Sequence, residues 1–504
     1  MNEIELKQHF EDAFYNQQNG KVDEAIVLFK QILDKFPNHA DALHGLGIAY
    51  AQKKQLQQAI PYLKQAIQLA PAVPGFHNNL ANAYKLNGQL DLAQRHYLEA
   101  LRLKTPYSEA NNNLGNVYYL QGSYREAAEQ FKKALRINPA LWDAHFNLAN
   151  CYLRQDLFLE AKPHLEEVLK YRPDHLGAIN NLGIIYCLLK QFEAAIPLLE
   201  TVMAREPSNV ESLFHLGIAH ASSNQLEKAK QDYIQVLALN DKHDKAHHNL
   251  ATLYLHLNDK ENALKHYERA YQLNPHNQTA LHMHKALTGQ TLKEGAPHEY
   301  TRALFDQYAY NYNQHMKEQL KYKVPQLLRS LINPYSQKKT STWKVLDLGC
   351  GTGLCAAYFM DISDKLYGVD LSPNMVDQAA KLEAYYKLAV SDISDYLAKT
   401  KESFELIIAA DVFVYFGDLE SILNQCYKVM TENAYFLFSI ESLENGTSPA
   451  QDYQLGATGR YQHNPDYIKS LAEKLSFKKI AQQTAAIRQQ ETGAVIGELY
   501  LLQK

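Results

Sequence analysis

The chain has 504 residues, 46% of them hydrophobic, so apolar material suffices for two to four domains with packed cores. The formal net charge of -4 argues against a basic nucleic-acid-binding surface, because affinity for the phosphate backbone comes from clustered Lys and Arg. No apolar run approaches the roughly 18 residues that a membrane helix needs, and the first residues lack an export signal. We therefore expect a cytoplasmic protein with no nucleic-acid and no membrane partner.

A leucine recurs every 34 residues through the first half of the chain, at Leu46, Leu80, Leu114, Leu148, Leu182, Leu216 and Leu250. A small residue follows each leucine, an aromatic residue usually stands four positions after it, and alanine and proline recur downstream with the same period. This spacing predicts two helices per repeat, with alanine allowing the second helix to approach closely. The pattern resembles the tetratricopeptide repeat. The resemblance implies an α-solenoid of about eight repeats plus a capping helix over residues 1–290, with a groove that binds a protein or peptide partner.

Asparagines gather on the side of the first helices that lies opposite the leucines, on a helical wheel of about 100° per residue. They are Asn79, Asn82, Asn113, Asn116, Asn147, Asn150, Asn181 and Asn249. An amide offers one donor and one acceptor group, as does each peptide unit of an extended chain, so we expect these side chains to bind a peptide main chain. The line resembles the asparagine ladder in the repeats of O-linked N-acetylglucosamine transferases. The alternative is that the asparagines bond only to their neighbours; Asn111 is expected to point toward the packed side.

Metal-ligating patterns are missing from the sequence. Several histidines lie in the repeats, but no acidic or cysteine partners accompany them at ligand spacing. The five cysteines form no C-x-x-C pair, and we interpret them as reduced thiols. We therefore expect no metal site.

The 34-residue period stops near residue 290, and short apolar strands then alternate with helices. The predicted strands are 343–349, 365–370, 386–392, 404–411 and 434–440, and the predicted helices are 373–385, 418–430 and 464–475. The last residues predict two strands joined at Glu491, Thr492 and Gly493, an antiparallel hairpin on an otherwise parallel sheet. We expect a second, doubly wound Rossmann-like α/β domain over residues 291–504.

A glycine-rich turn follows the first of these strands, in the stretch VLDLGCGTG, and the second strand ends at Asp370. Glycine removes the Cβ atom where the backbone must approach a ligand closely. The spacing is G-x-G-x-G rather than the G-x-G-x-x-G of dinucleotide enzymes. With YGVDLS, this stretch resembles class I S-adenosylmethionine-dependent methyltransferases. The resemblance implies that Gly349, Gly351 and Gly353 pass under the amino-acid part and ribose of S-adenosylmethionine, and that Asp347 helps to hold its amino group.

The same resemblance assigns roles to residues at the ends of the later strands. It implies that Asp370 binds the ribose hydroxyls and that Leu371 packs on adenine. Asp392 would meet the adenine amino group, Ile393 would offer its backbone amide, and Asp411 would face the methyl donor and the acceptor. For Asp392 and Asp411, a turn or a helix cap is the alternative.

The aromatic segment 299–322 resembles the N-terminal helix of methyltransferases of trans-aconitate and biotin synthesis, which closes over the cofactor. Tyr300, Phe305 and Tyr312 are the candidates for this role, and packing in a core is the alternative for all three.

Methyl transfer from a sulfonium is an in-line displacement, so the enzyme's main task is to align the acceptor with the methyl group. An oxygen or nitrogen acceptor must also lose a proton, for which a base can be needed. The candidate catalytic residues are Asp411, Tyr415 and His463, with Tyr461 as a further possibility.

The whole arrangement resembles bacterial methyltransferases that contain tetratricopeptide repeats, and this resemblance covers nearly the full chain. It implies an S-adenosylmethionine-dependent methyltransferase whose repeats bind a protein or peptide partner or substrate. One alternative is a small-metabolite methyltransferase whose repeats serve only assembly, and another is a non-catalytic repeat scaffold. The sequence does not identify the methyl acceptor.

Overall fold

The computed structural model of the chain describes residues 3–293, 295–309, 312–337, 342–443, 451–490 and 493–504. The chain divides into two compact units, Met1–Gln235 and Val236–Lys504. This division comes before the boundary at 290 that the loss of the 34-residue period predicts, so the last repeat groups with the α/β fold. The domain bounds 1–290 and 291–504 stay a prediction.

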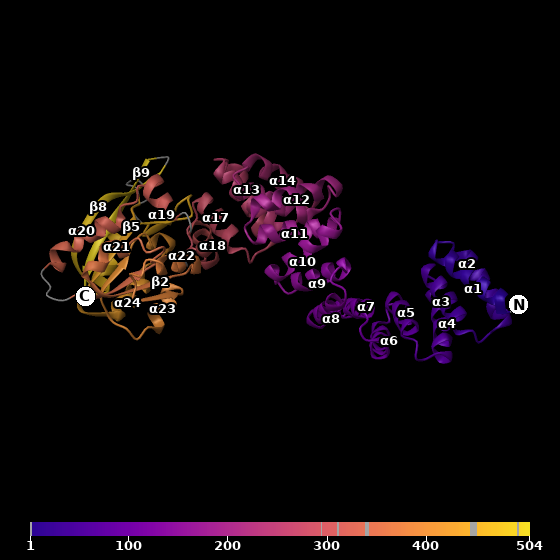
Figure 1. Cartoon of the computed structure of the whole chain (residues 1–504). Coiled ribbons are helices and arrows are strands. Elements are labelled where there is room, and N and C mark those ends of the chain that lie inside the picture. The colour runs from indigo at the N-terminus through magenta and orange to yellow at the C-terminus, as the bar shows by residue number, and fades with distance from the viewer. Residues whose placement is uncertain (1–2, 294, 310–311, 338–341, 444–450, 491–492) are drawn as a thin grey trace. The chain divides into compact units, whose positions relative to one another are not determined.

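The first unit consists of consecutive helix pairs, one pair per repeat (Figure 1). The pairs are α1 (Glu3–Gln18) and α2 (Val22–Lys35), α3 (Ala40–Gln52) and α4 (Leu56–Leu69), α5 (Pro74–Leu86) and α6 (Leu90–Leu103), α7 (Ser108–Leu120) and α8 (Tyr124–Ile137), α9 (Trp142–Leu153) and α10 (Phe158–Tyr171), α11 (Leu176–Leu188) and α12 (Phe192–Arg205), and α13 (Val210–Ser222) and α14 (Leu226–Leu239). The prediction of two helices per repeat is therefore confirmed.

The small residue after each recurring leucine is required by the packing of the two helices. A Cβ atom added to Gly47 would lie 2.6 Å from Leu63 Cγ, and one added to Gly115 would lie 2.7 Å from Phe131 Cε1. Contacts this short are repulsive, so a larger residue would force the helices of the pair apart. The recurring leucines and alanines are buried, as the 34-residue pattern predicts.

The second unit begins with the end of the repeats, namely α15 (Asp244–His256), α16 (Lys260–Leu273) and the expected capping helix α17 (Gln278–Thr288). Three helices then precede the sheet: α18 (His298–Tyr308), the short α19 (Tyr312–Gln314) and α20 (Val324–Ser336), with a π-helical turn at His315–Gln319. None of the helices in the described part of the chain is both long enough and apolar enough to cross a bilayer.

A seven-stranded sheet in the order β3-β2-β1-β4-β5-β9-β8 forms the centre of this unit. Its strands are β1 (Trp343–Leu348), β2 (Ser363–Asp370), β3 (Lys387–Val390), β4 (Phe404–Ala409), β5 (Met430–Glu441), β8 (Lys478–Gln490) and β9 (Gly493–Gln503). The first five strands are parallel, and β9 is antiparallel to both β5 and β8. The doubly wound sheet and its terminal hairpin are therefore as predicted, although Glu491 and Thr492 of the predicted turn lie outside the described residues.

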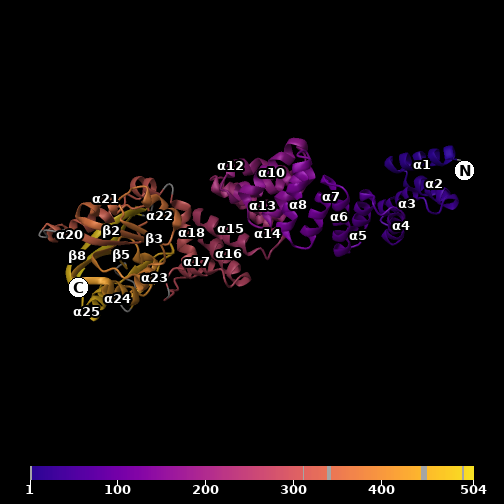
Figure 2. The ribbon, with the colours of Figure 1, turned by 60° about the horizontal axis from the view of Figure 1, so that its bottom comes forward.

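Helices cover both faces of the sheet, as Figure 2 shows. On one face α20 and α21 (Ala356–Phe359) pack against Trp343 and Val345, and on the other α23 (Ile393–Lys399), α24 (Glu420–Val429) and α25 (Pro465–Lys474) pack against Leu346 and Leu348. Successive side chains of a strand point to opposite faces, so β1 supplies both cores. The remaining elements are α22 (Pro373–Ala380) and a small two-stranded sheet of β6 (Tyr453–Leu455) and β7 (Tyr461–His463), which the sequence did not predict.

Candidate functional site

The carboxyl ends of the parallel strands place the candidate residues at one edge of the sheet. The glycine-rich turn follows β1, Asp370 ends β2, Asp392 follows β3 and Asp411 follows β4. In open α/β sheets, ligands bind outside this edge, where the strand order reverses. Here the order reverses between β1 and β4.

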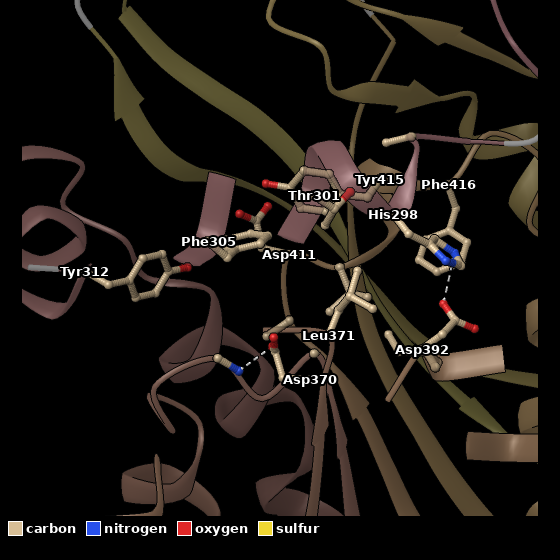
Figure 3. Close-up of a pocket in the computed structure, with 16 residues that line it drawn as sticks. His298, Thr301, Phe305, Tyr312, Asp370, Leu371, Asp392, Asp411, Tyr415 and Phe416 are labelled. Atoms are coloured by element: carbon tan, nitrogen blue, oxygen red, sulfur yellow. Dashed lines mark hydrogen bonds and ion pairs between the residues drawn. The ribbon is translucent and has the colours of Figure 1, made fainter. Parts of the chain in front are cut away.

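A pocket of about 800 Å³, partly open to solvent, lies at this edge (Figure 3). Of the predicted cofactor residues, seven line it: Gly349, Gly351, Asp370, Leu371, Asp392, Ile393 and Asp411. Asp347 and Gly353 do not line it. Tyr415 lines the pocket, as do Phe305 and Tyr312 of the aromatic segment, whereas Tyr300 does not.

Asp370 is held by the backbone of the two loops that flank it. Its carboxylate accepts hydrogen bonds from the Gly351 N–H and the Ser372 N–H, each at 2.9 Å. Burial raises the pKa of this carboxyl, and the two N–H groups counteract part of that rise. The carboxylate is thus fixed in orientation at the pocket wall, with oxygen lone pairs that suit a vicinal diol.

The three glycines of the turn serve different needs, although all three have positive φ. A Cβ atom on Gly349 would lie 2.7 Å from Cγ2 of the buried Val412, so Gly349 is required for packing, whereas one on Gly353 would lie 2.6 Å from Cδ1 of the exposed Leu382, which can move aside. A Cβ atom on Gly351 would meet nothing within 4 Å, because this residue borders the pocket. Gly351 therefore has open space beside its Cα atom, through which a ligand can approach the backbone, and its N–H also bonds to Asp370.

Asp347 lies beneath the turn, almost fully buried, where its carboxylate accepts a hydrogen bond of 2.7 Å from the Tyr385 hydroxyl. Burial raises the pKa of Asp347 to about 7; the Tyr385 bond counteracts this rise and the Asp370 carboxylate adds to it. Asp347 therefore supports the turn from behind. Its expected contact with the amino group of a cofactor stays a prediction.

Asp392 is the helix cap expected as the alternative, and it also lines the pocket, while its contact with an adenine amino group stays a prediction. Its carboxylate accepts from the Asp395 N–H at 3.0 Å and so caps the N-terminus of α23. The same carboxylate lines the pocket, and its Oδ2 lies 3.2 Å from Nε2 of His298 at the start of α18 (Figure 3). His298 lines the pocket as well, and the sequence analysis missed it.

Asp411 belongs to a buried network of two carboxylates and two guanidiniums. Its Oδ1 lies 2.6 Å from Arg460 Nη2 and 3.4 Å from Arg488 Nη1. Both arginines also bind Glu441, each through a contact of 2.6 Å. Asp411 has a left-handed φ of 60°, which places its N–H 2.9 Å from Ser439 Oγ. The two negative and two positive charges balance each other in a low-dielectric region. Removing one of them would leave a partner charge without compensation.

The same network holds Tyr415. Arg460 Nη1 donates to the Tyr415 hydroxyl at 3.0 Å, and the guanidinium lies over the Tyr415 ring at 5.2 Å. Burial raises the pKa of Tyr415 far above neutrality, despite the opposing effect of Arg460. For Glu441, burial favours a higher pKa, but the two guanidiniums outweigh it and lower the pKa. The carboxylate of Glu441 is therefore ionised and the phenol of Tyr415 protonated at neutral pH.

Helix α18 forms the wall opposite the strand ends. Its Phe305 ring contacts Tyr415 edge-on at 5.4 Å, and both residues line the pocket. Asp306 accepts a 2.5 Å hydrogen bond from Ser372 Oγ, so α18 is tied to the residue that also bonds Asp370. The expected placement of an aromatic segment beside the pocket thus matches the positions of Phe305 and Tyr312.

His463 is not brought to the pocket. It is fully buried in β7, and its Nε2 lies 3.0 Å from the carbonyl oxygen of Gly417. Burial lowers its pKa to about 4, so the ring is neutral at physiological pH. Tyr461, also fully buried, donates from its hydroxyl to the Leu292 carbonyl at 2.9 Å. Both residues support the loops next to the pocket, which is not the position expected of a base.

Sequence reasoning missed Arg460 and Arg488, as it missed His298. Arg460 stands in the GRYQHNPD stretch, beside the residues that attracted attention there, and Arg488 lies within a strand of mostly neutral residues. A lone charge inside a neutral strand is the available signal, because a buried charge needs a partner. The sequence could not show that both arginines converge on Asp411 and Glu441.

The candidate asparagines of the repeats join neighbouring first helices. Asn79 Nδ2 lies 2.9 Å from His44 Nε2, Asn113 Nδ2 donates to Asn78 Oδ1 at 3.4 Å, Asn147 Nδ2 donates to Asn112 Oδ1 at 3.4 Å, and Asn181 Nδ2 donates to Asn150 Oδ1 at 2.9 Å. All four are half-buried, so part of each amide still reaches solvent. The asparagines therefore do bond to their neighbours, and each amide keeps hydrogen-bonding capacity beyond these bonds.

The other members of the set differ from these four. Asn82 accepts a 2.6 Å hydrogen bond from the hydroxyl of Tyr97, on the second helix of its own repeat. Asn116 and Asn249 are half-buried on α7 and α15. Asn111 is buried and donates to the Tyr107 carbonyl at 2.8 Å, on the packed side as expected. Within the described residues, no group of three or more His, Cys, Asp or Glu is arranged to hold a metal ion.

Comparison with known families assigns both parts of the chain. The family described as Methyltransferase domain matches residues 346–438. Families described as TPR repeat or Tetratricopeptide repeat match residues 16–74, 74–106, 115–156, 153–213, 210–243 and 244–277. The first match covers the strands that form the pocket edge, and the others cover the helix pairs.

Individual relatives are similar over the second part of the chain. A malonyl-[acyl-carrier protein] O-methyltransferase of Acetivibrio thermocellus is 25% identical over 27% of this chain and 47% of the relative. A ubiquinone biosynthesis O-methyltransferase of Rhodopseudomonas palustris is 27% identical over 19% of this chain and 40% of the relative. The chain thus spans less than half the length of these curated relatives.

Among solved structures, a crystal structure described as YrrB, a TPR protein with an unusual peptide-binding site, is 22% identical. The similar region covers 38% of this chain and 97% of the YrrB chain, with a TM-score of 0.35. The repeat families, the methyltransferase family, the helix pairs and the strand order agree on one assignment. The chain is a tetratricopeptide-repeat protein that carries a class I methyltransferase domain.

Proposed function

We propose that this chain transfers a methyl group from S-adenosylmethionine to an acceptor, and that its repeats bind a protein or peptide that is the substrate or delivers it. The observation that carries the first part is the fixed carboxylate of Asp370, bonded to the Gly351 and Ser372 N–H groups at the wall of the pocket. This arrangement suits a ribose diol.

The pocket fits such a cofactor in three respects. It lies at the sheet edge where the strand order reverses, which is where ligands bind in open α/β sheets. Gly351 leaves open space where a Cβ atom would otherwise stand, so the backbone can approach a ligand. Leu371 and Ile393 supply apolar surface for a flat base, and the Asp392 carboxylate beside them suits an exocyclic amino group.

The bound cofactor would supply an electrophilic methyl group on a sulfonium. Alignment of the acceptor with that group is then the task of the chain's own residues. Asp411, Tyr415 and Phe305 form the wall that a group entering beside the cofactor would meet. Phe305 and Phe416 add apolar surface to this wall.

Asp411 and Tyr415 suit orientation of the acceptor rather than removal of its proton. Two guanidiniums engage Asp411 Oδ1, and burial keeps Tyr415 protonated. An acceptor that is already nucleophilic at neutral pH matches this wall best, because it needs no general base. The relatives named as O-methyltransferases favour an oxygen as the acceptor atom.

The proposed partner of the repeats is an extended peptide. Its support is the row of half-buried amides that link successive first helices at Asn79, Asn113, Asn147 and Asn181. Each amide can still bond to a peptide unit, and the row follows the repeat direction as an extended main chain would.

Labelled S-adenosylmethionine separates the two parts of this proposal. The full chain is incubated with the labelled compound and with fractionated lysate, and label is followed into proteins and into small molecules. Label in protein that decreases when Asn79, Asn113 and Asn147 are changed together to Ala supports both parts. Label confined to small molecules, and unaffected by the triple variant, contradicts delivery by the repeats. Absence of any transferred label contradicts the methyl transfer.

The triple variant needs a matched control, because it also removes bonds between repeats. Changing Asn78 and Asn112 to Ala breaks the bonds to Asn113 and Asn147 but keeps the amides of the proposed row. If both variants weaken transfer equally, the asparagines act through the structure of the array rather than through the partner.

A further inference from the structure

The capping helix of the repeats packs directly on the methyltransferase fold through the small β6–β7 sheet. Ala286 of α17 forms one apolar cluster with Leu455 and Tyr461. His282, on the same helix, is fully buried, and its Nε2 lies 2.9 Å from the carbonyl oxygen of Gly459. All of these residues belong to the second compact unit.

Gly459 leaves no free space in this contact. Its φ is +77°, and an added Cβ atom would lie 2.5 Å from the Tyr300 hydroxyl and 3.1 Å from Met283 Sδ. The turn between β6 and β7 is therefore enclosed by α17 and α18. Burial lowers the pKa of His282, so the neutral ring donates its Nε2 proton to the Gly459 carbonyl.

The carbonyl that His282 holds belongs to the peptide unit that leads into Arg460. A peptide unit is planar, so fixing its oxygen also fixes the direction of the next residue's N–Cα bond. Arg460 donates to Asp411 Oδ1 at 2.6 Å and to the Tyr415 hydroxyl at 3.0 Å. A short covalent and hydrogen-bonded path thus joins the capping helix to two residues of the pocket wall.

The linker after α17 makes a second contact with the same wall. The Ala296 N–H donates to the Tyr415 carbonyl at 2.8 Å. A Cβ atom on Gly417 would lie 2.8 Å from the Leu292 carbonyl oxygen, so the linker passes directly over this loop. The end of the repeats therefore contacts both the backbone and the side chain of Tyr415, the latter through Arg460.

We propose that His282 is a positioning residue for the methyl-transfer site, through which the capping helix of the repeats sets the placement of Arg460, Asp411 and Tyr415. The inference rests on the proposed function for its biological meaning, but the coupling itself is a property of the fold. A state of the repeats that displaces α17 would disorder the acceptor side of the pocket, and a ligand that orders the pocket would stabilise α17, because coupling between two sites is reciprocal.

Hydrogen exchange of the full chain tests this coupling in His282→Ala and His282→Gln. The reporters are the amide hydrogens of Asp411, Tyr415 and Phe416, which donate to Ser439 Oγ, the Val412 carbonyl and the Phe413 carbonyl. In His282→Ala we expect these amides to exchange at least about 10-fold faster through local opening. In His282→Gln we expect rates within about 3-fold of the unchanged chain, because the Gln amide can donate to the Gly459 carbonyl.

His282→Met distinguishes positioning from simple loss of packing, because Met has about the volume of Gln but no donor for the Gly459 carbonyl, so we expect it to exchange as fast as His282→Ala. His220→Ala is the matched control, because His220 is a buried histidine of the first unit, bonded to Asp232. It should leave the three reporters unchanged. Equal exchange in His282→Ala and the unchanged chain, or failure of Gln to restore the rates, would overturn the inference.

The unchanged chain provides a test that needs no variant. S-adenosylhomocysteine is added, and exchange is followed at the reporters and at Ala286 of α17. Slower exchange at both places supports the coupling, and slower exchange at the reporters alone contradicts it. If the compound does not bind at all, the cofactor assignment of the proposed function fails, while the comparison of Ala and Gln at position 282 still decides the coupling.

Discussion

Polar side chains are used differently in the repeats and in the pocket. Along the repeats, an amide such as Asn113 shares one hydrogen bond with a neighbour and remains half-exposed. At the pocket, Asp411 and Glu441 are buried among two guanidiniums, and Asp370 is bonded by two backbone N–H groups. The repeat surface therefore keeps hydrogen-bonding capacity that the proposed peptide could use, whereas the pocket residues are already held in place by their bonds to one another.

The largest expected effect comes from removing one charge of the buried network. Arg460→Met leaves Asp411 and Glu441 with a single guanidinium, so we expect the unfolding free energy of the second unit to fall by about 3–5 kcal/mol. Urea unfolding measures this, with Trp343 fluorescence as the reporter in a Trp142→Phe background, since the chain has two tryptophans. Arg329→Met, which breaks an ion pair with the mostly exposed Asp361, should cost no more than about 1 kcal/mol. Equal losses would show that the network is not stabilised by mutual pairing.

The second test is the pH dependence of folding stability that Asp347 causes. Its folded pKa of about 7 lies above the ordinary value of about 3.9, so the folded state binds a proton more tightly than the unfolded state. Stability from this group is present below about pH 4 and is lost as pH rises through 7. Asp347→Asn should flatten the pH dependence in this window and raise stability at pH 8, on the order of 1–3 kcal/mol. The exposed Asp364→Asn should leave the curve as it is; an equal effect there would remove Asp347 as the cause.

Glycine substitutions separate packing from ligand approach. Ala at Gly349 or Gly351 is expected to cost about 1 kcal/mol of stability, because both have positive φ. Gly349→Ala must also displace Val412, whereas Gly351→Ala places its methyl group at the pocket and should weaken S-adenosylhomocysteine binding more than it lowers stability. Gly122→Ala is the control, with φ +78° and open space in the repeats. If Gly351→Ala binds as tightly as Gly122→Ala, the turn does not contact the ligand.

The smallest expected effect is in the repeats. Asn113→Ala removes one partly exposed hydrogen bond, so we expect a loss of about 0.5–1 kcal/mol of stability. Asn111→Ala, which removes a shorter bond in a buried place, should cost at least as much. Thermal unfolding compares the two. A larger loss for Asn113 would mean that the amide row is chiefly a structural element, and that the partner hypothesis needs another surface.

Sequence alone predicted most of the fold because its signals are periodic and local. The 34-residue leucine spacing determines the helix pairs, and the alternation of strands and helices determines the sheet, since each element must bury one face. The candidate residues at the strand ends, from Gly349 to Asp411, came from the resemblance to class I methyltransferases, and the fold gathers them because the carboxyl ends of parallel strands meet at one edge. These signals do not depend on contacts between distant parts of the chain.

What sequence missed depends on such contacts. Arg460, just before β7, and Arg488, on β8, meet Asp411 after β4 only in the folded chain, and His298 meets Asp392 only after α18 folds back on the pocket. The burial of His463, a candidate catalytic residue, could not be predicted because the short β6–β7 sheet has no strong sequence pattern of its own. The hydrogen bond between Asn82 and Tyr97 could not be predicted, because a helical wheel gives the direction of a side chain but not its hydrogen-bond partner.

The central claim, a cofactor site organised around Asp370, is tested most directly by calorimetric titration of S-adenosylhomocysteine into the full chain and into Asp370→Ala. The account predicts saturable binding at one site, weakened on the order of 100-fold in Asp370→Ala, because the diol acceptor and the bonds to two loops are lost together. No binding to the unchanged chain, or equal affinity in the two proteins, would contradict it.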